Sequence, residues 1–393
     1  MAGHTIHTTA ARLCLAFAMT NLECEVAVIG AGMAGASIAA HLAEHAVVRL
    51  LEMEDHAGYH STGRSAAQFS ETYGNKAIRA LSRASRAFLF SPPAGFAASP
   101  LVKLRGNLTF GKAGQEELLD TYADSLEPGY GVERLSATRT LKLCPILRPD
   151  DLSGGVLEPH SADIDVHALH LGYLKLFKSR GGSVTTASQV THLERKSGAW
   201  WITTPTTTLR ADTVVNAAGA WAGEVGKLAG AFDIGLEPRR RTAVLIEPPA
   251  GITSGDWPMV GDVEETFYIK PDAGLLLLSP ADETPVPAGD VQPEDLDVAV
   301  AIDRLERATG MEVRRVVRTW AGLRSFVADR SPCVGFDPRQ PGFFWHAALG
   351  GYGIQTAPAL GELAAALVLQ RGVDERLSAI GLDAKTLSPS RLG

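Results

Sequence analysis

The chain has 393 residues, of which 45% are hydrophobic and 21% charged, with a formal net charge of −7. This composition is typical of a globular protein that is long enough to form two hydrophobic cores. The acidic balance disfavours a nucleic-acid partner, which requires a basic face, and no apolar run approaches the length of a membrane-spanning segment.

The first 22 residues do not read as part of a folded domain. Arg12 precedes a short apolar run at residues 13–19, which gives a weak signal-peptide pattern without a clean cleavage motif. We therefore expect residues 1–22 to form a disordered extension, and secretion is disfavoured. An internal start at Met19 would fit the same pattern, so residues 1–18 need not belong to the native protein.

The strongest motif begins with the apolar run VAVI at residues 26–29. It leads into Gly30-x-Gly32-x-x-Gly35, a helix-like segment and a second apolar run that ends on Glu52. In this order, Gly30 permits a tight turn, Gly32 admits a pyrophosphate close to the backbone, and Gly35 lets the helix pack on the strand. The helix N-terminus attracts phosphate, and Glu52 can accept both ribose hydroxyls. The motif predicts a dinucleotide-binding domain of Rossmann type.

Further elements follow in chain order from apolar spacing, glycine turns and proline stops. The predicted helices cover residues 75–90, 165–178, 297–309 and 353–370. The predicted strands cover residues 183–186, 213–217, 241–247, 267–270, 275–279 and 313–320, with a strand pair in 101–110 and a hairpin at 199–202 and 206–211.

The loop YHSTGRSAA at residues 59–67 helps to choose the dinucleotide. It is small and polar, it contains a glycine, and it carries one fixed cation, Arg64. Its backbone donors and hydroxyls suit a flavin and a second set of pyrophosphate contacts, with Arg64 approaching the phosphates. A solvated surface loop and a nicotinamide cofactor are the alternatives.

The fingerprint followed by STGRSAA resembles the glycine/D-amino acid oxidase (DAO) family of FAD enzymes, most closely its D-arginine dehydrogenase branch. Four further segments carry the resemblance: ADIDVHALHLGY at residues 162–173, FYIKPDAG at 267–274, TWAGLRSFVAD at 319–329 and GGYGIQT at 350–356. The resemblance covers the chain from about residue 23 onward. It implies an α/β fold (α+β overall), in which a Rossmann-like FAD-binding domain carries a discontinuous substrate domain on a mixed, largely antiparallel sheet.

The glycine-rich segments near residues 30, 219 and 351 are far apart in the sequence, so a single cofactor requires a discontinuous nucleotide domain. We expect residues 23–85, 161–235 and 321–393 to form the FAD-binding domain. Residues 86–160 and 236–320 would then form the substrate domain.

The resemblance implies noncovalent FAD and a set of cofactor contacts from these glycine-rich segments and their flanks. The expected contacts are Gly30, Gly32, Met33, Ala34, Gly35, Glu52, Met53, Ser61, Thr62, Gly63, Arg64, Ser65, Ala66, Ala67, Gln68, Val190, Ala217, Gly219, Trp221, Gly350, Gly351, Tyr352, Gly353, Ile354, Gln355 and Thr356.

An α-amino acid substrate needs a clamp for its carboxylate, and the planar fork of an arginine matches two oxygens. Arg241 and Arg324 both lie beside apolar residues, and the resemblance assigns them to this clamp. It further implies that Tyr268 contacts the carboxylate, that Tyr73 closes the pocket, and that the backbone carbonyl of Gly351 accepts from the substrate amine.

Three positions depart from the D-arginine dehydrogenase pattern. Asn107 stands where that branch has a glutamate, and an amide cannot neutralise a cationic side chain. Gln68 replaces a histidine, which predicts a flatter dependence on pH, and Ser70 replaces a threonine. The change at Asn107 predicts a preference for neutral or apolar over cationic D-amino acids.

The four cysteines, Cys14, Cys24, Cys144 and Cys333, show no disulfide or metal-binding spacing. We expect reduced thiols in a cytoplasmic protein and no metal site. Some relatives tether their flavin to a cysteine, but Cys333 is out of register with that position.

The function that these expectations favour is oxidative deamination of D-amino acids. Oxidation of secondary amines such as sarcosine or cyclic imino acids is the nearest alternative, and a flavoprotein acting on tRNA is disfavoured by the acidic balance. The sequence leaves open the electron acceptor (a quinone, a dye-like acceptor or O2), peripheral membrane association, and the choice between a monomer and a small homo-oligomer.

Overall fold

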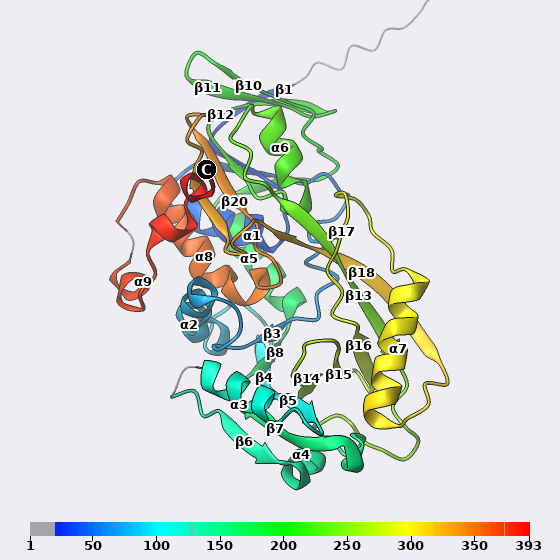
Figure 1. Ribbon diagram of the computed structural model, residues 1–393. Helices are drawn as coiled ribbons and strands as arrows, with labels where there is room; N and C mark the ends of the chain where they lie inside the picture. The colour runs from blue at the N-terminus through cyan, green and yellow to red at the C-terminus, as the bar shows by residue number, and fades with distance from the viewer. Residues whose placement is uncertain (1–19, 127–128, 373) are drawn as a thin grey trace, which may run out of the picture.

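A computed structural model describes residues 20–126, 129–372 and 374–393 of the chain. Two large sheets organise the described residues (Figure 1). The expected extension over residues 1–22 lies outside the described residues as far as residue 19. Its last three residues were assigned wrongly, because they belong to strand β1 (Thr20–Ile29), which pairs with a parallel neighbour from residue 20 onward.

The first sheet has a parallel core in the order β9–β2–β1–β12–β20. The other strands of this core are β2 (Val48–Leu51), β9 (Ser183–Thr185), β12 (Thr207–Asn216) and β20 (Phe343–Ala347). Strands covered on both faces need nearly continuous apolar sequence, and the runs VAVI and FFWHA meet that need. All five parallel strands end at the same edge of the sheet, where the Gly30 turn lies.

Helices cover one face of this sheet and bury its largest core. They are α1 (Met33–Leu42), α2 (Lys76–Phe90), α5 (Val166–Ser179) and α8 (Gly353–Val368). α1 and α8 are rich in alanine and pack closely, so that a Cβ on Gly361 would lie 2.8 Å from the Ser37 hydroxyl. The predicted helices at residues 75–90, 165–178 and 353–370 are confirmed within a few residues.

The edge of the first sheet carries antiparallel additions. β10 (His192–Lys196) and β11 (Ala199–Thr203) form a hairpin on the first half of β12, and β19 (Cys333–Phe336) pairs with β20. The predicted hairpin of residues 199–202 and 206–211 is confirmed as β11 and the first half of β12. The buried strand expected separately at residues 213–217 is the second half of the same strand β12, because no turn interrupts residues 207–216.

The second sheet is mixed, and all its neighbouring strands are antiparallel except β14 and β5. Its strands are β5 (Asn107–Lys112), β6 (Glu133–Ser136), β7 (Leu152–Glu158), β13 (Glu237–Ile246), β14 (Met259–Asp262), β15 (Tyr268–Asp272), β16 (Leu275–Ser279), β17 (Thr284–Pro285) and β18 (Val316–Phe326). The predicted fold class, a Rossmann-like domain combined with a mixed, largely antiparallel sheet, is confirmed.

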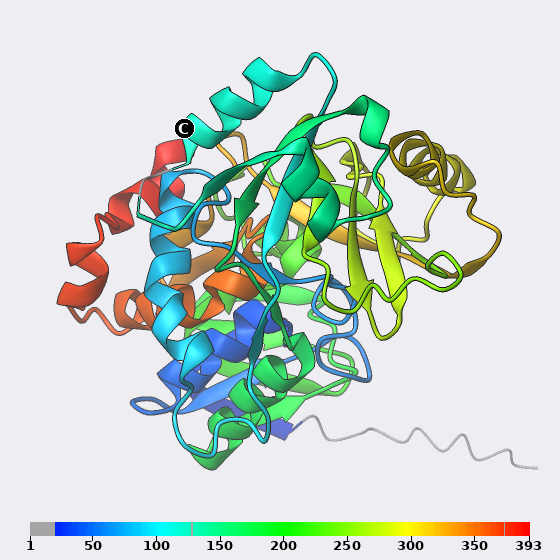
Figure 2. The same cartoon turned by 90° about the horizontal axis from the view of Figure 1, so that it is seen from below.

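The two faces of the second sheet differ in chemistry because successive side chains alternate between them. One face buries Leu108, Val244 and Ile269 against helix α7 (Asp295–Thr309). Figures 1 and 2 place α7 and α8 on opposite sides of this sheet. The other face carries polar side chains at the intervening positions, and it is the face that contributes to the site described below.

Three smaller features bear on the expected layout. β3 (Gln68–Phe69), β4 (Val102–Leu104) and β8 (Ala162–Ile164) form a separate small sheet. The strand pair expected in residues 101–110 is therefore wrong in its pairing, because β4 joins β8 whereas β5 joins β7. β18 continues through residue 321, the expected domain boundary, while remaining paired with β13.

His346 is buried and His41 is half-buried, and each lacks a hydrogen-bond partner at one ring nitrogen within the described ranges. Burial lowers the pKa of His41 and of His346 to about 4, and Arg180 lowers that of His41 further. Between pH 6.5 and 4 the unfolded chain therefore binds protons that the folded chain does not, and stability falls as the pH falls.

We expect each of these histidines to remove about 2 kcal/mol of unfolding free energy between pH 7.5 and pH 5. Urea unfolding at both pH values measures this. His346→Leu should lose less unfolding free energy on acidification than the parent protein does. His160→Gln, which changes an exposed position, should lose as much as the parent protein. An equal pH slope in all three proteins would contradict the prediction.

Candidate cofactor and substrate site

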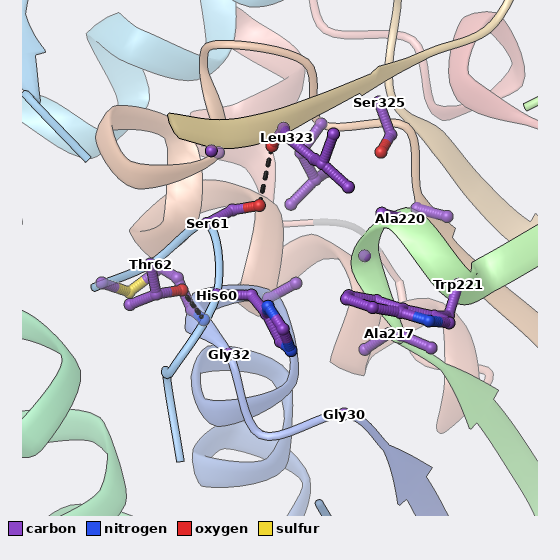
Figure 3. A pocket seen from close by; sticks show the side chains of 18 of the residues that line it. Gly30, Gly32, His60, Ser61, Thr62, Ala217, Ala220, Trp221, Leu323 and Ser325 are labelled. Atoms are coloured by element: carbon purple, nitrogen blue, oxygen red, sulfur yellow. Dashed lines mark hydrogen bonds between the residues drawn. The ribbon is translucent and has the colours of Figure 1, made fainter. Parts of the chain in front are cut away.

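A cavity of about 570 Å³ lies between the carboxyl ends of the parallel strands and the polar face of the second sheet. This edge of an open α/β sheet is where ligands generally bind. Figure 3 shows the cavity between the start of α1, the segment at Ser61 and Thr62, and the turn that carries Trp221. Its size suits a cofactor with a small substrate.

The turn after β1 requires glycine at two positions. Gly30 has φ of +98°, and a Cβ there would lie 2.5 Å from the carbonyl oxygen of Ala217. A Cβ on Gly35 would lie 1.7 Å from the carbonyl oxygen of Gly30. Gly30 therefore allows the tight turn and the close approach of the Ala217 backbone, and Gly35 allows the helix to pack on the strand, as the motif predicted.

The N-terminus of α1 opens into the cavity. Gly32 is its N-cap residue and has no side chain to bond the first helical N–H groups. The Thr62 hydroxyl accepts a hydrogen bond from the Met33 N–H at 2.9 Å, which ties the STGR segment to the helix (Figure 3). The remaining N–H groups of the first turn, with the helix dipole, favour an anionic phosphate.

Glu52 is a buried carboxylate at the end of β2, with 7% of its surface exposed. Its Oε2 accepts from the Ala31 N–H at 2.8 Å, and its Oε1 accepts from the Glu54 N–H at 3.1 Å. The carboxylate is thus fixed in orientation and still lines the cavity, which is the arrangement that holds the ribose of an adenosine. The glycine turn, the helix N-terminus and this acid together fit FAD.

Glu52→Gln should weaken FAD binding by about 10- to 100-fold, since a hydrogen bond to a charged group contributes about 1.5–3 kcal/mol. Quenching of flavin fluorescence on titration into apoprotein measures the dissociation constant. Glu54→Gln is the matched control, because Glu54 is a nearby carboxylate that is not itself among the lining residues and pairs with His60. Equal FAD affinity in both variants would contradict the assignment.

Most of the predicted cofactor residues line the cavity. They are Gly30, Gly32, Met33, Ala34, Glu52, Met53, Ser61, Thr62, Arg64, Ser65, Ala66, Val190, Ala217, Gly219, Trp221, Gly350, Gly351, Gly353 and Ile354. The others are not among the lining residues: Gly35, Gly63, Ala67, Gln68, Tyr352, Gln355 and Thr356.

The residues outside the lining have other contacts. The Gln68 side chain donates to the Gly106 carbonyl at 3.0 Å, and the Gln355 amide bonds the Ser70 N–H and the Ser82 hydroxyl. The Thr356 hydroxyl donates to the Tyr352 carbonyl within α8. These bonds hold the segments around the cavity in place.

The guanidinium of Arg64 is engaged by the protein although the side chain lines the cavity, and its expected approach to the phosphates stays a prediction. Its Nη1 donates to the carbonyls of Val291 and Ala321, and its Nη2 pairs with Asp290 at 2.5 Å. The side chain therefore joins the STGR segment to β18 and the loop before α7. This contact could not be predicted from the sequence, because Asp290 is 226 positions away from Arg64.

The expected substrate residues Arg241, Tyr268, Arg324 and Gly351 all line the cavity. Tyr73 is not among the lining residues; it is 44% exposed, and its ring lies 5.2 Å from that of Tyr352. Because β13, β15 and β18 belong to one sheet, their alternate side chains share one face. The tertiary structure thus brings together residues from three distant segments.

Arg324 has no hydrogen bond or ion pair with the described part of the protein, although it is partly buried. A Cβ on Gly351 would lie 2.8 Å from its Nη1, so that glycine makes room for the guanidinium. Burial acts to lower the pKa of Arg324, but Tyr268 and Tyr73 hold it above its ordinary value. The fork is therefore charged and available to an anion.

Tyr268 faces the same region. Burial acts to raise the pKa of its phenol, but the nearby charges of Arg324 and Arg241 outweigh it and lower the pKa overall. A phenol beside two guanidinium groups donates readily to a carboxylate.

Arg241 differs from Arg324 because two of its three nitrogens are already bonded to the protein. Its Nε donates to the Asp282 carbonyl at 2.7 Å, and its Nη2 pairs with Glu283 at 3.1 Å. It lines the cavity as one half of an ion pair.

Asn107 lies beside a carboxylate that the sequence argument did not foresee. Its Nδ2 donates to Glu158 Oε1 at 2.8 Å, because the two residues are cross-strand neighbours on β5 and β7. Glu158 is 5% exposed and also accepts from the hydroxyls of Ser70, Thr72 and Tyr122. Neither Asn107 nor Glu158 lines the cavity.

Sequence reasoning missed several lining residues. They include His60, Ser188, Gln189, Thr191, Ala218, Ala220, Glu224, Lys227, Leu323, Ser325 and His346. The His60 ring lies 4.5 Å from that of Trp221, and its Nε2 lies 2.8 Å from Glu54. Its position directly before the STGR segment was the available signal.

The remaining expectations concern cysteines, metals and membranes. Cys24, Cys144 and Cys333 are buried and free, and burial raises the pKa of the Cys333 thiol to about 12. Cys14 lies outside the described residues. Over the described ranges, no group of side chains could hold a metal ion, and no helix has the length and apolar character to cross a bilayer.

Comparison with known proteins identifies the family. A family model described as FAD dependent oxidoreductase (DAO) matches residues 25–367. Mitochondrial sarcosine dehydrogenase from Homo sapiens is 27% identical over 273 residues, which are 64% of this chain and 29% of that enzyme. The chain therefore spans less than a third of that relative's length.

Solved structures show the same fold over nearly the whole chain. Glycine oxidase from Geobacillus kaustophilus has a TM-score of 0.81 at 22% identity, covering 94% of this chain and 99% of that one. L-proline dehydrogenase from P.horikoshii has a TM-score of 0.81 at 21% identity, covering 95% and 98%. At these identities the likeness establishes the fold.

Proposed function

We propose, from the premise that this chain belongs to the DAO family of FAD-dependent oxidoreductases, that it catalyses the oxidative deamination of D-amino acids. The observation that carries the proposal is Arg324, a charged guanidinium that lines the cavity without a bonded partner in the described part of the chain, beside the phenol of Tyr268. An unengaged arginine fork is suited to a substrate carboxylate.

In this proposal the protein binds and orients the substrate. Arg324 and Tyr268 hold the carboxylate, and the Gly351 carbonyl accepts a hydrogen bond from the amine. When bound, FAD supplies an acceptor for the hydride from the substrate Cα. The amine loses one proton to solvent, and the imino acid is hydrolysed to a 2-oxo acid and ammonia. Holding the substrate in a fixed orientation toward the cofactor accounts for much of the rate of the chemical step.

The preferred substrates in this proposal are neutral or apolar rather than cationic. Within the described residues, the substrate end of the cavity is lined by Arg241, Arg324 and Tyr268. Glu283, beside Arg241, is not among the lining residues and is already paired with Arg241 and Arg330. Glu158, near Asn107, already accepts hydrogen bonds from four neutral donors. A cationic side chain would therefore be desolvated without a counter-charge.

Oxidation of secondary amines is the second candidate. Sarcosine dehydrogenase and L-proline dehydrogenase are among the similar proteins, and their names denote secondary-amine substrates. The same arginine would hold the carboxylate, so the two candidates differ in the amine that the site admits.

Anaerobic titration of the purified holoprotein separates the candidates. Bleaching of the flavin band by D-Leu and D-Met, with D-Arg much weaker, is the expected result. Bleaching by sarcosine alone would favour the second candidate, and bleaching by D-Arg as readily as by D-Leu would overturn the preference for neutral substrates. Absence of bleaching by every D-amino acid would overturn the main proposal.

Two properties stay predictions, the noncovalent attachment of FAD and a cytoplasmic location. The identity of the electron acceptor and the oligomeric state stay open. Oxygen consumption would test O2 as the acceptor, and light scattering would give the oligomeric state. Release of flavin on acid precipitation would test noncovalent attachment.

A further inference from the structure

His170 is a buried histidine that does not line the cavity. It lies near the start of α5 and is 4% exposed. Its Nε2 lies 2.8 Å from the carbonyl oxygen of Ala31, in the glycine turn after β1, although the two residues are 139 positions apart. A carbonyl oxygen only accepts hydrogen bonds, so Nε2 is the donor. His170 thus joins α5 to the turn that approaches the cofactor.

The ring of His170 is neutral and confined. Burial lowers the pKa of His170 more than the bonded carbonyl of Ala31 raises it, and the neighbouring His167 lowers it further. A neutral imidazole has a single N–H, which the carbonyl keeps on Nε2. Gly58 makes room for the ring, because a Cβ on Gly58 would lie 2.8 Å from Cε1 of His170. The donor is therefore held in one place and one tautomer.

Two side chains fix the backbone of Ala31 from both sides. Its N–H donates to Glu52 Oε2 at 2.8 Å, and its carbonyl accepts from His170. The peptide bond between Ala31 and Gly32 is trans, so its N–H points opposite to its carbonyl. With the carbonyl held toward α5, the Gly32 N–H points away from α5. Gly32 lines the cavity, and its N–H has no hydrogen-bond partner among the described residues.

We propose that His170 is a positioning residue for the cofactor, which acts by directing the Gly32 N–H at the pyrophosphate of FAD. A donor that is oriented before binding loses little freedom when the phosphate arrives. Without the donor of His170, the peptide between Ala31 and Gly32 could turn, and the Ala31 carbonyl would be left without its partner. The inference concerns the cofactor alone, so it does not depend on which amine the holoprotein oxidises.

Two substitutions at position 170 separate the hydrogen bond from the packing. His170→Leu fills a similar volume without a donor, and it should weaken FAD binding by about 10- to 100-fold. His170→Gln keeps an N–H donor near the position of Nε2, and it should bind FAD within about threefold of the parent protein. Quenching of flavin fluorescence on titration into apoprotein measures both constants. Equal losses in the two variants would overturn the inference, because packing alone would then explain them.

ADP locates the effect within the cofactor, since it carries the adenosine and pyrophosphate of FAD without the flavin. Calorimetric titration of apoprotein with ADP should show that His170→Leu weakens ADP by about the same factor as FAD. An ADP affinity equal to that of the parent protein would overturn the inference. His167→Gln is the matched control, because it changes an exposed histidine on the same helix; it should leave the affinities for FAD and ADP unchanged.

The tautomer of His170 gives a test in the unaltered holoprotein, which remains available if His170→Leu does not fold. Nuclear magnetic resonance of protein labelled with ¹⁵N-histidine shows which ring nitrogen carries the proton, and the His170 signals are those missing from the spectrum of His170→Gln. We expect the proton on Nε2 at pH 7. A proton on Nδ1 alone would refute the inference, because a bare Nε2 cannot donate to the Ala31 carbonyl.

Discussion

Arg324→Met should lower kcat/KM for D-amino acids by about 10²- to 10⁴-fold, which corresponds to the loss of two charge-assisted hydrogen bonds to the substrate carboxylate. The reason is specific to this side chain. Arg241 bonds Asp282 and Glu283 through two of its nitrogens, whereas Arg324 lines the cavity with no bonded partner among the described residues. We expect the loss to fall mainly on KM, because the carboxylate is held in the same way before and during reaction.

Two companion variants make this result interpretable. Arg324→Lys keeps the charge but loses the planar fork, and it should recover no more than about a tenth of the parent kcat/KM. Arg318→Met removes an exposed arginine from the same strand and should leave kcat/KM and the flavin spectrum unchanged. Equal activity of Arg324→Met and the parent would remove the basis of the proposed function.

Gly35→Ala should abolish stable folding of the FAD-binding domain or its capture of FAD. The added methyl would lie 1.7 Å from the carbonyl oxygen of Gly30. Gly30 begins the turn after β1 and Gly35 lies in the first turn of α1, so neither can move without separating the helix from the strand. We expect a destabilisation of more than about 4 kcal/mol, at the upper end for a single substitution.

Gly223→Ala is the control for this prediction. Gly223 lies in α6 (Ala222–Leu228), and a Cβ there would meet its nearest neighbour at an ordinary 3.9 Å. Replacement of glycine by alanine within a helix stabilises it by about 0.5–1 kcal/mol. Thermal unfolding and the flavin content of both purified variants provide the measurement. A Gly35→Ala protein with a normal flavin content would show that the turn can adapt.

The sequence by itself determined the parts of the protein that depend on neighbours along the chain. The turn at Gly30, Gly32 and Gly35 and the acid at Glu52 were predictable, because one strand, one turn and one helix confine them to about 25 residues. Helices such as α2 and α5 were predictable from apolar spacing and from their N-cap residues Asn75 and Asp165. Local sterics and local hydrogen bonds decide these features.

The tertiary structure alone decided which charges are free. Arg64 pairs with Asp290, and Asn107 lies opposite Glu158 on the next strand; neither neighbour could be read from the sequence. An ion pair depends on distance in space, and the partners of Arg64 and Asn107 lie about 226 and 51 positions away in the chain. Residue type therefore marked the site, and packing determined which side chains remain available to a substrate.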